Sequence, residues 1–470
     1  MSTKDLTTGS ITKNIVSFSL PYMLAYFLQI LYGLADLFVI GQYCGVESTT
    51  AVSNGAQVMY MVTVVLIGIS MGTTVLTALS IGAKDQNRVR QIVGNTIGLF
   101  AIISMLLMVV LLSLRGWIVD VMNTPLAAVS GMKSYLTVCF IGIPFIVAYN
   151  IIASIFRGLG DTKSPMYFVA VACGFNILLD YVFIGMLHLG ATGAALGTTI
   201  SQMLSVIFAL SSIRRHKGVL DIKRKDLRLR RDIIGEILKI GVPIAMQDGF
   251  IQISFLIISV IANGRGLIDA AAVGIVEKFI GLVFIVPSAM LSTVSAISAQ
   301  NIGAGKMPRA TATMRCAMMI TTVYGLTCAI VLQFVPELAV GIFTDDAQVL
   351  AQGSEYLRGY VWDCVFAGIH FCFSGFFTAC GYSILSFIHN SISIMTARIP
   401  LAWLFSNLYP DTLYPMGLAT CTGSVVSCVI CIGAYCWLMR RKRKTIAANA
   451  RWMLSDDRVS CVVPTIASLF

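Results

Sequence analysis

Residues 19–43 read SLPYMLAYFLQILYGLADLFVIGQY, an apolar run long enough to cross a bilayer as one helix. A proline, Pro21, and a single carboxylate, Asp36, interrupt its apolar character. A charge at bilayer depth costs roughly 2.5–3.5 kcal/mol on insertion scales, so such a residue usually faces an internal cavity and marks an ion or substrate path. A second long apolar run carries Asp180 in the same way. The two runs therefore predict a membrane protein with an acidic site in its interior.

The composition excludes a soluble protein. Of the 470 residues, 57% are hydrophobic and only 12% are charged, against about 25% charged residues in soluble domains. The net charge of +11 would suit a nucleic acid, but the basic residues lie in short loops beside apolar runs, with no interleaved aromatic surface. We therefore expect an all-α integral membrane protein that contacts membrane lipids and no nucleic acid.

Twelve apolar segments have the length of a transmembrane helix. They cover approximately residues 15–40, 55–80, 92–114, 132–155, 164–187, 191–213, 234–262, 271–298, 311–334, 352–377, 383–407 and 413–439. Basic residues concentrate in alternate loops, above all in 214–231 and 440–444, which predicts that those loops and both termini are cytoplasmic. The expected location is the plasma (inner) membrane, which the chain crosses many times.

The chain repeats itself at an offset of 221 residues. The matching pairs are SIGAKD (80–85) with QNIGAGKM (300–307), Ala51-Val52 with Ala272-Val273, Tyr135-Leu136 with Tyr356-Leu357, and SIFRGLG (154–160) with GFFTACG (375–381), while Pro21 and Pro243 match at 222. Six helices per unit make the units parallel repeats, which are typical of secondary transporters. We predict two pseudo-symmetric six-helix lobes, 1–213 and 233–440, joined by a basic cytoplasmic linker, 214–232, and followed by a cytoplasmic tail, 441–470.

Three helices each bring a polar side chain to one depth of the first lobe. At 1.5 Å per residue, Asp36 lies in the outer part of its helix, Asp180 about 26 Å along its own, and Thr198 about 10 Å in from the outside. Asn176 precedes Asp180 by one turn and shares its face. The alternative is that each aspartate lies near the interface and only snorkels or caps.

Carboxylate, amide and hydroxyl oxygens suit a hard cation. Because burial disfavours the charged form of a carboxyl group, a proton would serve equally well. The predicted cation or proton site consists of Asp36, Asn176, Asp180 and Thr198. Na⁺ is the possible metal, and no cofactor is expected apart from the H⁺ or Na⁺ bound there. Pro21 would kink its helix, either as a hinge that moves when Asp36 changes charge or as a static bend.

The segments FRGLGDTKSP (156–165) and RIPLAWLF (398–405), together with the basic linker, resemble the multidrug and toxic compound extrusion (MATE) family over about residues 10–440. The resemblance implies two six-helix lobes arranged in a V. It also implies an antiporter, not an enzyme, that exports organic cations and amphiphilic xenobiotics in exchange for H⁺ or Na⁺ by alternating access. Its partners would be these small molecules and membrane lipids, with no obligate protein partner.

Within that family, the resemblance is to the DinF-like branch. The cation and proton site of that branch, in the first lobe, is matched here by Pro21, Asp36, Asn176, Asp180 and Thr198. Tyr135 and Asn150 resemble residues of its substrate cavity, and Arg157 is expected to hold the cytoplasmic loop.

Other polar residues and other functions remain as alternatives. The second-lobe acids Asp248, Glu277 and Asp363 fit no pattern that we align. His370 and His389 could relay protons but are expected to be packed or interfacial. A lipid-linked oligosaccharide flippase, or another lipid flippase of the same superfamily, is the nearest rival function. An enzyme is disfavoured because the chain has no H-E-x-x-H, no P-loop and no G-x-S-x-G with suitable partners.

Overall fold

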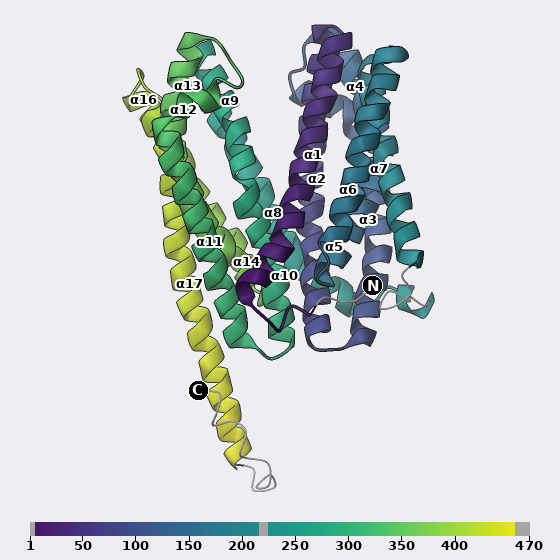
Figure 1. Cartoon of the computed structure of the whole chain (residues 1–470), viewed down its shortest axis with the longest axis vertical. Coiled ribbons are helices and arrows are strands. Elements are labelled where there is room, and N and C mark those ends of the chain that lie inside the picture. The colour runs from purple at the N-terminus through teal and green to yellow at the C-terminus, as the bar shows by residue number, and fades with distance from the viewer. Residues whose placement is uncertain (1–4, 216–223, 456–470) are drawn as a thin grey trace.

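The computed structural model describes residues 5–215 and 224–455, and every regular element in them is a helix (Figure 1). In chain order they are α1 (Ile11–Tyr43), α2 (Val46–Gly82), α3 (Gln86–Val121), α4 (Leu126–Ile141), α5 (Ile143–Gly158), α6 (Lys163–Asp180), η1 (Tyr181–Met186), α7 (Gly190–Arg215), η2 (Arg224–Leu227), α8 (Arg231–Asn263), α9 (Leu267–Val283), α10 (Ile285–Gly303), α11 (Met307–Phe334), α12 (Pro336–Val340), α13 (Ala347–Tyr360), α14 (Asp363–Ala379), α15 (Ser383–Ser393), η3 (Ile394–Arg398), α16 (Ile399–Leu408) and α17 (Tyr414–Ser455). The elements η1 and η3 are π-helical. Of the predicted linker, 216–223 lies outside the described residues, as does the predicted tail beyond Ser455.

The described helices confirm the predicted all-α membrane fold. Nine helical stretches, two of which join consecutive elements (α6 with η1, and α9 with α10), are long and apolar enough to span a membrane. Two bent pairs raise the number of candidate spans in the described residues to as many as eleven. The pairs are α4–α5, bent by 49°, and α13–α14, bent by 42°. Pro144, in the first turn of α5, explains the first bend because proline cannot continue the hydrogen bonding of α4. The remaining predicted span, 383–407, is helical through α15, η3 and α16 but is not among these candidates.

Equivalent contacts recur in the two halves of the chain at the offset of 221 residues. The hydroxyl of Thr74 donates a hydrogen bond to the carbonyl of Ser154 at 3.0 Å. The residues 221 positions later, Ser295 and Gly375, make the same contact at 3.1 Å. A π-helical segment follows α6 in the first repeat and α15 in the second. The duplication read from the sequence is therefore expressed in the packing of the helices.

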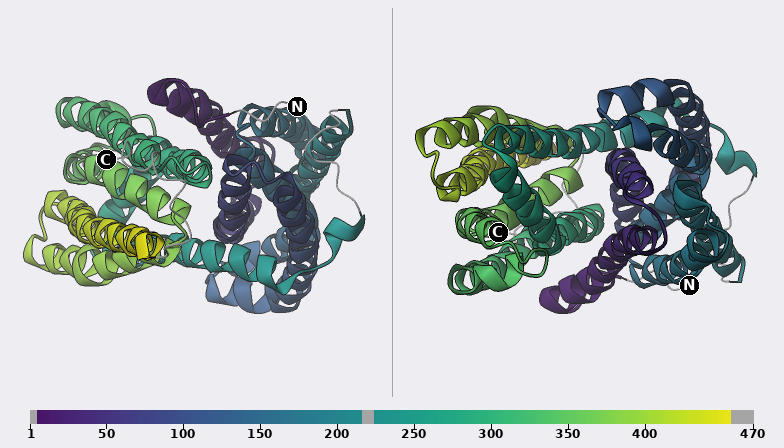
Figure 2. Two further views of the ribbon diagram at one scale, coloured as in Figure 1. Left: turned by 90° about the horizontal axis from the view of Figure 1, so that it is seen from below. Right: turned by 90° about the horizontal axis from the view of Figure 1, so that it is seen from above.

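Helices α1–α7, hereafter the first half, and α8–α17, hereafter the second half, form two groups of ribbons (Figures 1 and 2). In Figure 1 the groups lie apart at the top and meet at the bottom, hereafter the narrow end. Helix α2 packs there against α8 and α10 of the other half. Helix α1 belongs to both groups, because its start packs on α10 and α11 while its later part packs on α6.

Two glycines bring the backbones of the halves together at the narrow end. A Cβ atom added at Gly82 would lie 1.9 Å from the carbonyl oxygen of Gln300, and one added at Gly303 would lie 2.0 Å from that of Leu79. Each residue of one contact is 221 positions from its counterpart in the other, so the two contacts are related by the pseudo-symmetry. Only glycine allows such close approach of α2 and α10.

The chain before α1 is attached to the second half. The Leu6 amide donates to the side-chain oxygen of Gln300 at 2.8 Å, and Lys306 donates to the Thr7 carbonyl at 3.0 Å. Arg309 donates to the carbonyls of Thr8 and Gly9, both at 2.8 Å. The side chain of Leu6 is buried in the apolar core of the second half. Helix α1 therefore starts from an anchor on one half and ends within the other.

Arg265, between α8 and α9, ties the loop between α16 and α17 to the second half. Its guanidinium forms an ion pair with Asp269 at 2.6 Å, and the side chains are only 8% and 15% exposed. The same guanidinium also donates to the carbonyls of Ser406, Tyr409, Pro410 and Thr412. Because removing one partner leaves the other charge buried, we expect Arg265→Ala to lower the free energy of unfolding by about 3 kcal/mol.

Thermal unfolding of the purified protein in detergent would measure this loss. A matched control is Arg358→Ala, which removes an ion pair with Glu337 at 3.0 Å whose side chains are 39% and 50% exposed. Exposed pairs contribute roughly 0–1 kcal/mol, so this variant should unfold close to the wild-type temperature. Equal effects of the two substitutions would contradict the assigned role of Arg265.

Candidate functional site

The structure brings Asp36, Asn176, Asp180 and Thr198 together from three helices of the first half. The Thr198 hydroxyl of α7 donates a hydrogen bond to Asp36 Oδ2 of α1 at 3.1 Å. Asp180 and Asn176, both on α6, lie close enough to Asp36 for their side chains to interact with it. The two aspartates and the asparagine are each at most 5% exposed. The residues predicted to lie at one depth on three different helices therefore lie together in the structure.

The oxygens of this cluster are mostly without partners. Among the described residues, Asp36 Oδ1, both carboxylate oxygens of Asp180 and both side-chain polar atoms of Asn176 are buried and form no hydrogen bond. A buried ionised carboxylate without a compensating partner is strongly unfavourable. Two adjacent carboxyl groups relieve that cost by taking up a proton or by coordinating a cation. The carboxylate, amide and hydroxyl oxygens of the cluster suit H⁺ or Na⁺.

Gly197 makes room for the Asp180 carboxylate and was missed in the sequence. A Cβ atom at this position would lie 2.4 Å from Asp180 Oδ1. Asp180 is also the last residue of α6, directly before the π-helical turn η1, and such turns often occur at functional sites. Since the chain contains 40 glycines, its sequence has no signal that distinguishes Gly197 from the others.

Pro21, the predicted hinge, is buried inside α1, which runs as one continuous helix from Ile11 to Tyr43. One turn earlier, the Phe18 carbonyl accepts a hydrogen bond from the Thr162 hydroxyl at 2.8 Å. The equivalent Pro243 is likewise inside α8. The proline therefore lies between the anchored start of α1 and the acidic cluster, where a bend would move one relative to the other.

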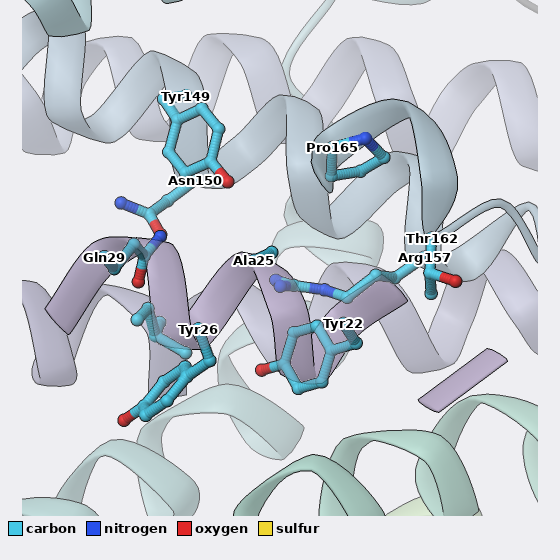
Figure 3. Close-up of a pocket in the computed structure, with 10 residues that line it drawn as sticks. Tyr22, Ala25, Tyr26, Gln29, Tyr149, Asn150, Arg157, Thr162 and Pro165 are labelled. Atoms are coloured by element: carbon cyan, nitrogen blue, oxygen red, sulfur yellow. The ribbon is translucent and has the colours of Figure 1, made fainter. Parts of the chain in front are cut away.

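A small pocket lies in the first half between α1, α2, α5 and α6 (Figure 3). Its lining residues are Tyr22, Ala25, Tyr26, Gln29, Ile67, Tyr149, Asn150, Arg157, Thr162 and Pro165. Asn150, one of the two predicted cavity residues, is among them and donates to the Ile146 carbonyl at 2.9 Å. The other, Tyr135, is instead buried with its ring against Gly55 in the core of the first half.

The second half contains a separate polar cluster. Arg398 donates to the Tyr360 hydroxyl at 2.9 Å and lies over the ring of Phe255, 4.7 Å from its centroid. Glu277 and Asp363 are both within electrostatic range of this guanidinium.

The two histidines of that half are packed, as expected. Their rings lie 5.5 Å apart, and His389 Nε2 is 2.8 Å from the Ser374 hydroxyl. Asp248, on α8, lies away from this cluster, within electrostatic range of Tyr26 and Tyr60.

Comparisons with known proteins agree with this fold. The MatE family model matches residues 21–182 and 243–404, once in each half. The "Probable multidrug resistance protein YpnP" of Bacillus subtilis (strain 168) is 26% identical over 407 residues, covering 86% of this chain and 91% of the relative. The "Multidrug export protein MepA" of Staphylococcus aureus (strain MSSA476) is 24% identical, covering 78% and 82%.

Solved structures have the same fold. A multidrug resistance MATE family transporter of the MOP superfamily, in an outward-facing conformation, superposes with a TM-score of 0.86. It is 22% identical, and the superposition covers 94% of this chain and 98% of that one. A MATE in a bent conformation also superposes with a TM-score of 0.86 at 22% identity, over 95% and 98% of the chains. Because the family model accounts for more than half of the sequence and matches both repeats, this chain belongs to the MatE family.

Proposed function

We propose that the protein is a secondary active multidrug efflux transporter, not an enzyme, that exports organic cations and amphiphilic xenobiotics in exchange for H⁺ or Na⁺. Membership of the MatE family and the names of its relatives, which include a multidrug export protein, support the cargo class. The observation that supports coupling of export to H⁺ or Na⁺ is the pair of buried carboxylates, Asp36 and Asp180, whose oxygens include atoms without hydrogen-bond partners among the described residues. This first-half location supports assignment to the DinF-like branch.

Alternating access would move the lobe 1–213 relative to the lobe 233–440, with 214–232 as the connector and 441–470 as the tail. Uptake of a cation neutralises the cluster at Asp36 and removes the electrostatic cost of burying it. Helix α1 passes this change on, because its start is anchored on the second half and Pro21 lies between the anchor and the cluster. Bending at Pro21 would then change the packing of α1 between the two halves and release the cargo.

The proposed location is the plasma (inner) membrane, with both termini and the narrow end in the cytoplasm. The basic residues of the loops at the narrow end support this orientation, Lys84 after α2 and Lys306 after α10 among them. The positions of Asp36 and Asp180 towards the other end would then place the buried cluster nearer the outer face, from which the cation would enter.

Flux measurements test this function directly. Proteoliposomes containing the purified protein should accumulate or release ethidium only when a pH gradient or a Na⁺ gradient is imposed. The ion whose gradient drives flux is the coupling ion, and reversal of that gradient should reverse the direction of ethidium movement. Ethidium flux that is independent of both gradients would contradict the proposed antiport.

Substitution of Gly197 gives a separate prediction. We expect Gly197→Ala to displace the Asp180 carboxylate, because the new methyl group would lie 2.4 Å from its Oδ1. The concentration of driving ion needed for half-maximal flux should rise by roughly tenfold, equivalent to about 1.4 kcal/mol. Gly174→Ala, in α6, is the control, since a Cβ there meets nothing within 4 Å. An unchanged ion requirement in Gly197→Ala would show that this contact is irrelevant to coupling.

A further inference from the structure

The pocket in the first half contains an arginine that pairs with no acid. The side chain of Arg157 is 6% exposed, and its Nε and Nη2 atoms are buried without a hydrogen-bond partner among the described residues. Its guanidinium carbon lies 5.2 Å from the centroid of the Tyr22 ring. Figure 3 shows the guanidinium extending along the pocket wall above that ring. Arg157 therefore does not hold the cytoplasmic loop as expected but presents its charge to the pocket.

The acids near Arg157 do not neutralise it. Asp161, four residues later, is occupied, because its Oδ1 accepts from the amides of Lys163 and Ser164 and its Oδ2 from the Ser164 hydroxyl at 2.6 Å. None of the ten residues that line the pocket, all in the described part of the chain, is a carboxylate. Asp248 lies within electrostatic range of Tyr26 but does not line the pocket.

The buried arginine of the second half differs in this respect. Arg398 donates to a tyrosine hydroxyl and has Glu277 and Asp363 within electrostatic range. A buried charge without such compensation is costly. The pocket around Arg157 is thus electrostatically incomplete until an anion enters it.

The rest of the lining suits the polar end of an amphiphile. The side chains of Tyr22, Tyr26, Tyr149, Gln29 and Asn150 give the pocket hydroxyl and amide groups. In Figure 3 the Tyr22 ring lies below the guanidinium, and Gln29 and Asn150 lie beside each other further along the pocket. A guanidinium fork matches the oxygens of a phosphate or a carboxylate with two parallel hydrogen bonds.

We propose that this pocket binds the oxyanion end, phosphate or carboxylate, of an amphiphilic molecule through Arg157. A membrane phospholipid and a soluble anionic amphiphile offer the same chemistry to the pocket. The assignment does not depend on ion-coupled transport, since it concerns equilibrium binding at residues about 10 Å or more along α1 from Asp36.

Binding can be measured by the thermal unfolding of the full-length protein in a neutral detergent, with octyl phosphate as the probe. Octyl phosphate should raise the unfolding temperature saturably in the wild type. Octyltrimethylammonium has the same chain and the opposite charge, and any shift that it causes should be the same in Arg157→Gln as in the wild type. Arg157→Gln should weaken octyl phosphate binding at least tenfold, and Arg157→Lys should weaken it less. Arg231→Gln, which removes an exposed arginine at the start of α8, should bind as the wild type does.

Two further arms identify the source of the anion. Competition by inorganic phosphate at concentrations similar to those of octyl phosphate would indicate a soluble anion. Weaker octyl phosphate binding in nanodiscs of phosphatidylglycerol than in nanodiscs of phosphatidylcholine would indicate that a lipid headgroup occupies the pocket.

Equal octyl phosphate affinity in Arg157→Gln and the wild type would overturn the proposal. If Arg157→Gln does not fold, Tyr149→Phe and Asn150→Leu keep the guanidinium and remove other polar groups of the lining. Each should weaken octyl phosphate binding several-fold, and unchanged affinity in both would equally overturn it.

Discussion

Asp36→Asn and Asp180→Asn should each abolish gradient-driven export while leaving the protein folded. Asparagine has nearly the same shape as aspartate but neither takes up a proton at physiological pH nor carries the negative charge that attracts Na⁺. The side chains are buried at 5% and 0% exposure and have unpartnered oxygens, so removing the charge should not cost stability. We expect coupled flux to fall by roughly a hundredfold, equivalent to about 2.7 kcal/mol.

Ethidium flux in proteoliposomes under the driving gradient measures this loss, and thermal unfolding checks the fold. Asp120→Asn is the matched control, because Asp120 is exposed near the end of α3 and belongs to no cluster. Ethidium binding without a gradient should persist in both site variants, since asparagine keeps the shape of the side chain it replaces. Coupled flux at the wild-type rate in both variants would refute the assignment of the site.

The membrane fold could be predicted from the sequence because its signals are local. The thickness of the bilayer sets the length of an apolar membrane-spanning run, so such runs can be recognised one at a time. The repeat offset of 221 can be read from short matching segments. The acidic cluster could also be predicted, because the depth of a residue along a helix follows from its residue number. Asp36, Asp180 and Thr198 needed only a helix start and 1.5 Å per residue to be placed in one layer.

The features missed in the sequence depend on contacts between distant segments. Gly197 matters because the Asp180 carboxylate approaches it from another helix, and Arg157 because the nearby Asp161 is occupied elsewhere. The attachment of Leu6 to Gln300 joins residues 294 positions apart and has no periodic pattern. Such contacts are fixed by tertiary packing, which composition and periodicity do not encode locally.

Gly82→Val and Gly303→Val should each open the narrow end of the molecule. The new Cβ atoms would lie 1.9 Å and 2.0 Å from the carbonyl oxygens of Gln300 and Leu79. Helices α2 and α10 would have to separate by about 1.5 Å to restore an ordinary contact of about 3.5 Å. Overpacking of this kind costs about 1–3 kcal/mol. Here it destabilises the conformation in which the narrow end is closed. A conformation with that end open avoids the cost, so its population should rise roughly tenfold.

Amide hydrogen exchange of the full-length protein in detergent would report this opening. Exchange should accelerate in the peptides around Leu79 and Gln300 and stay unchanged in α13, which lies at the opposite end in Figure 1. Gly281→Val, in α9, is the control, because a Cβ there meets nothing within 4 Å.

The pseudo-symmetry also determines how the single and double glycine variants should compare. Because the two glycine contacts are equivalent, the single variants should accelerate exchange to the same extent and on both sides of the interface. The double variant should add little, since a single separation of α2 from α10 relieves both contacts. Exchange that rises only in the substituted helix would mean that the chain absorbs the methyl groups locally, and the closed narrow end would then not be held by these backbone contacts.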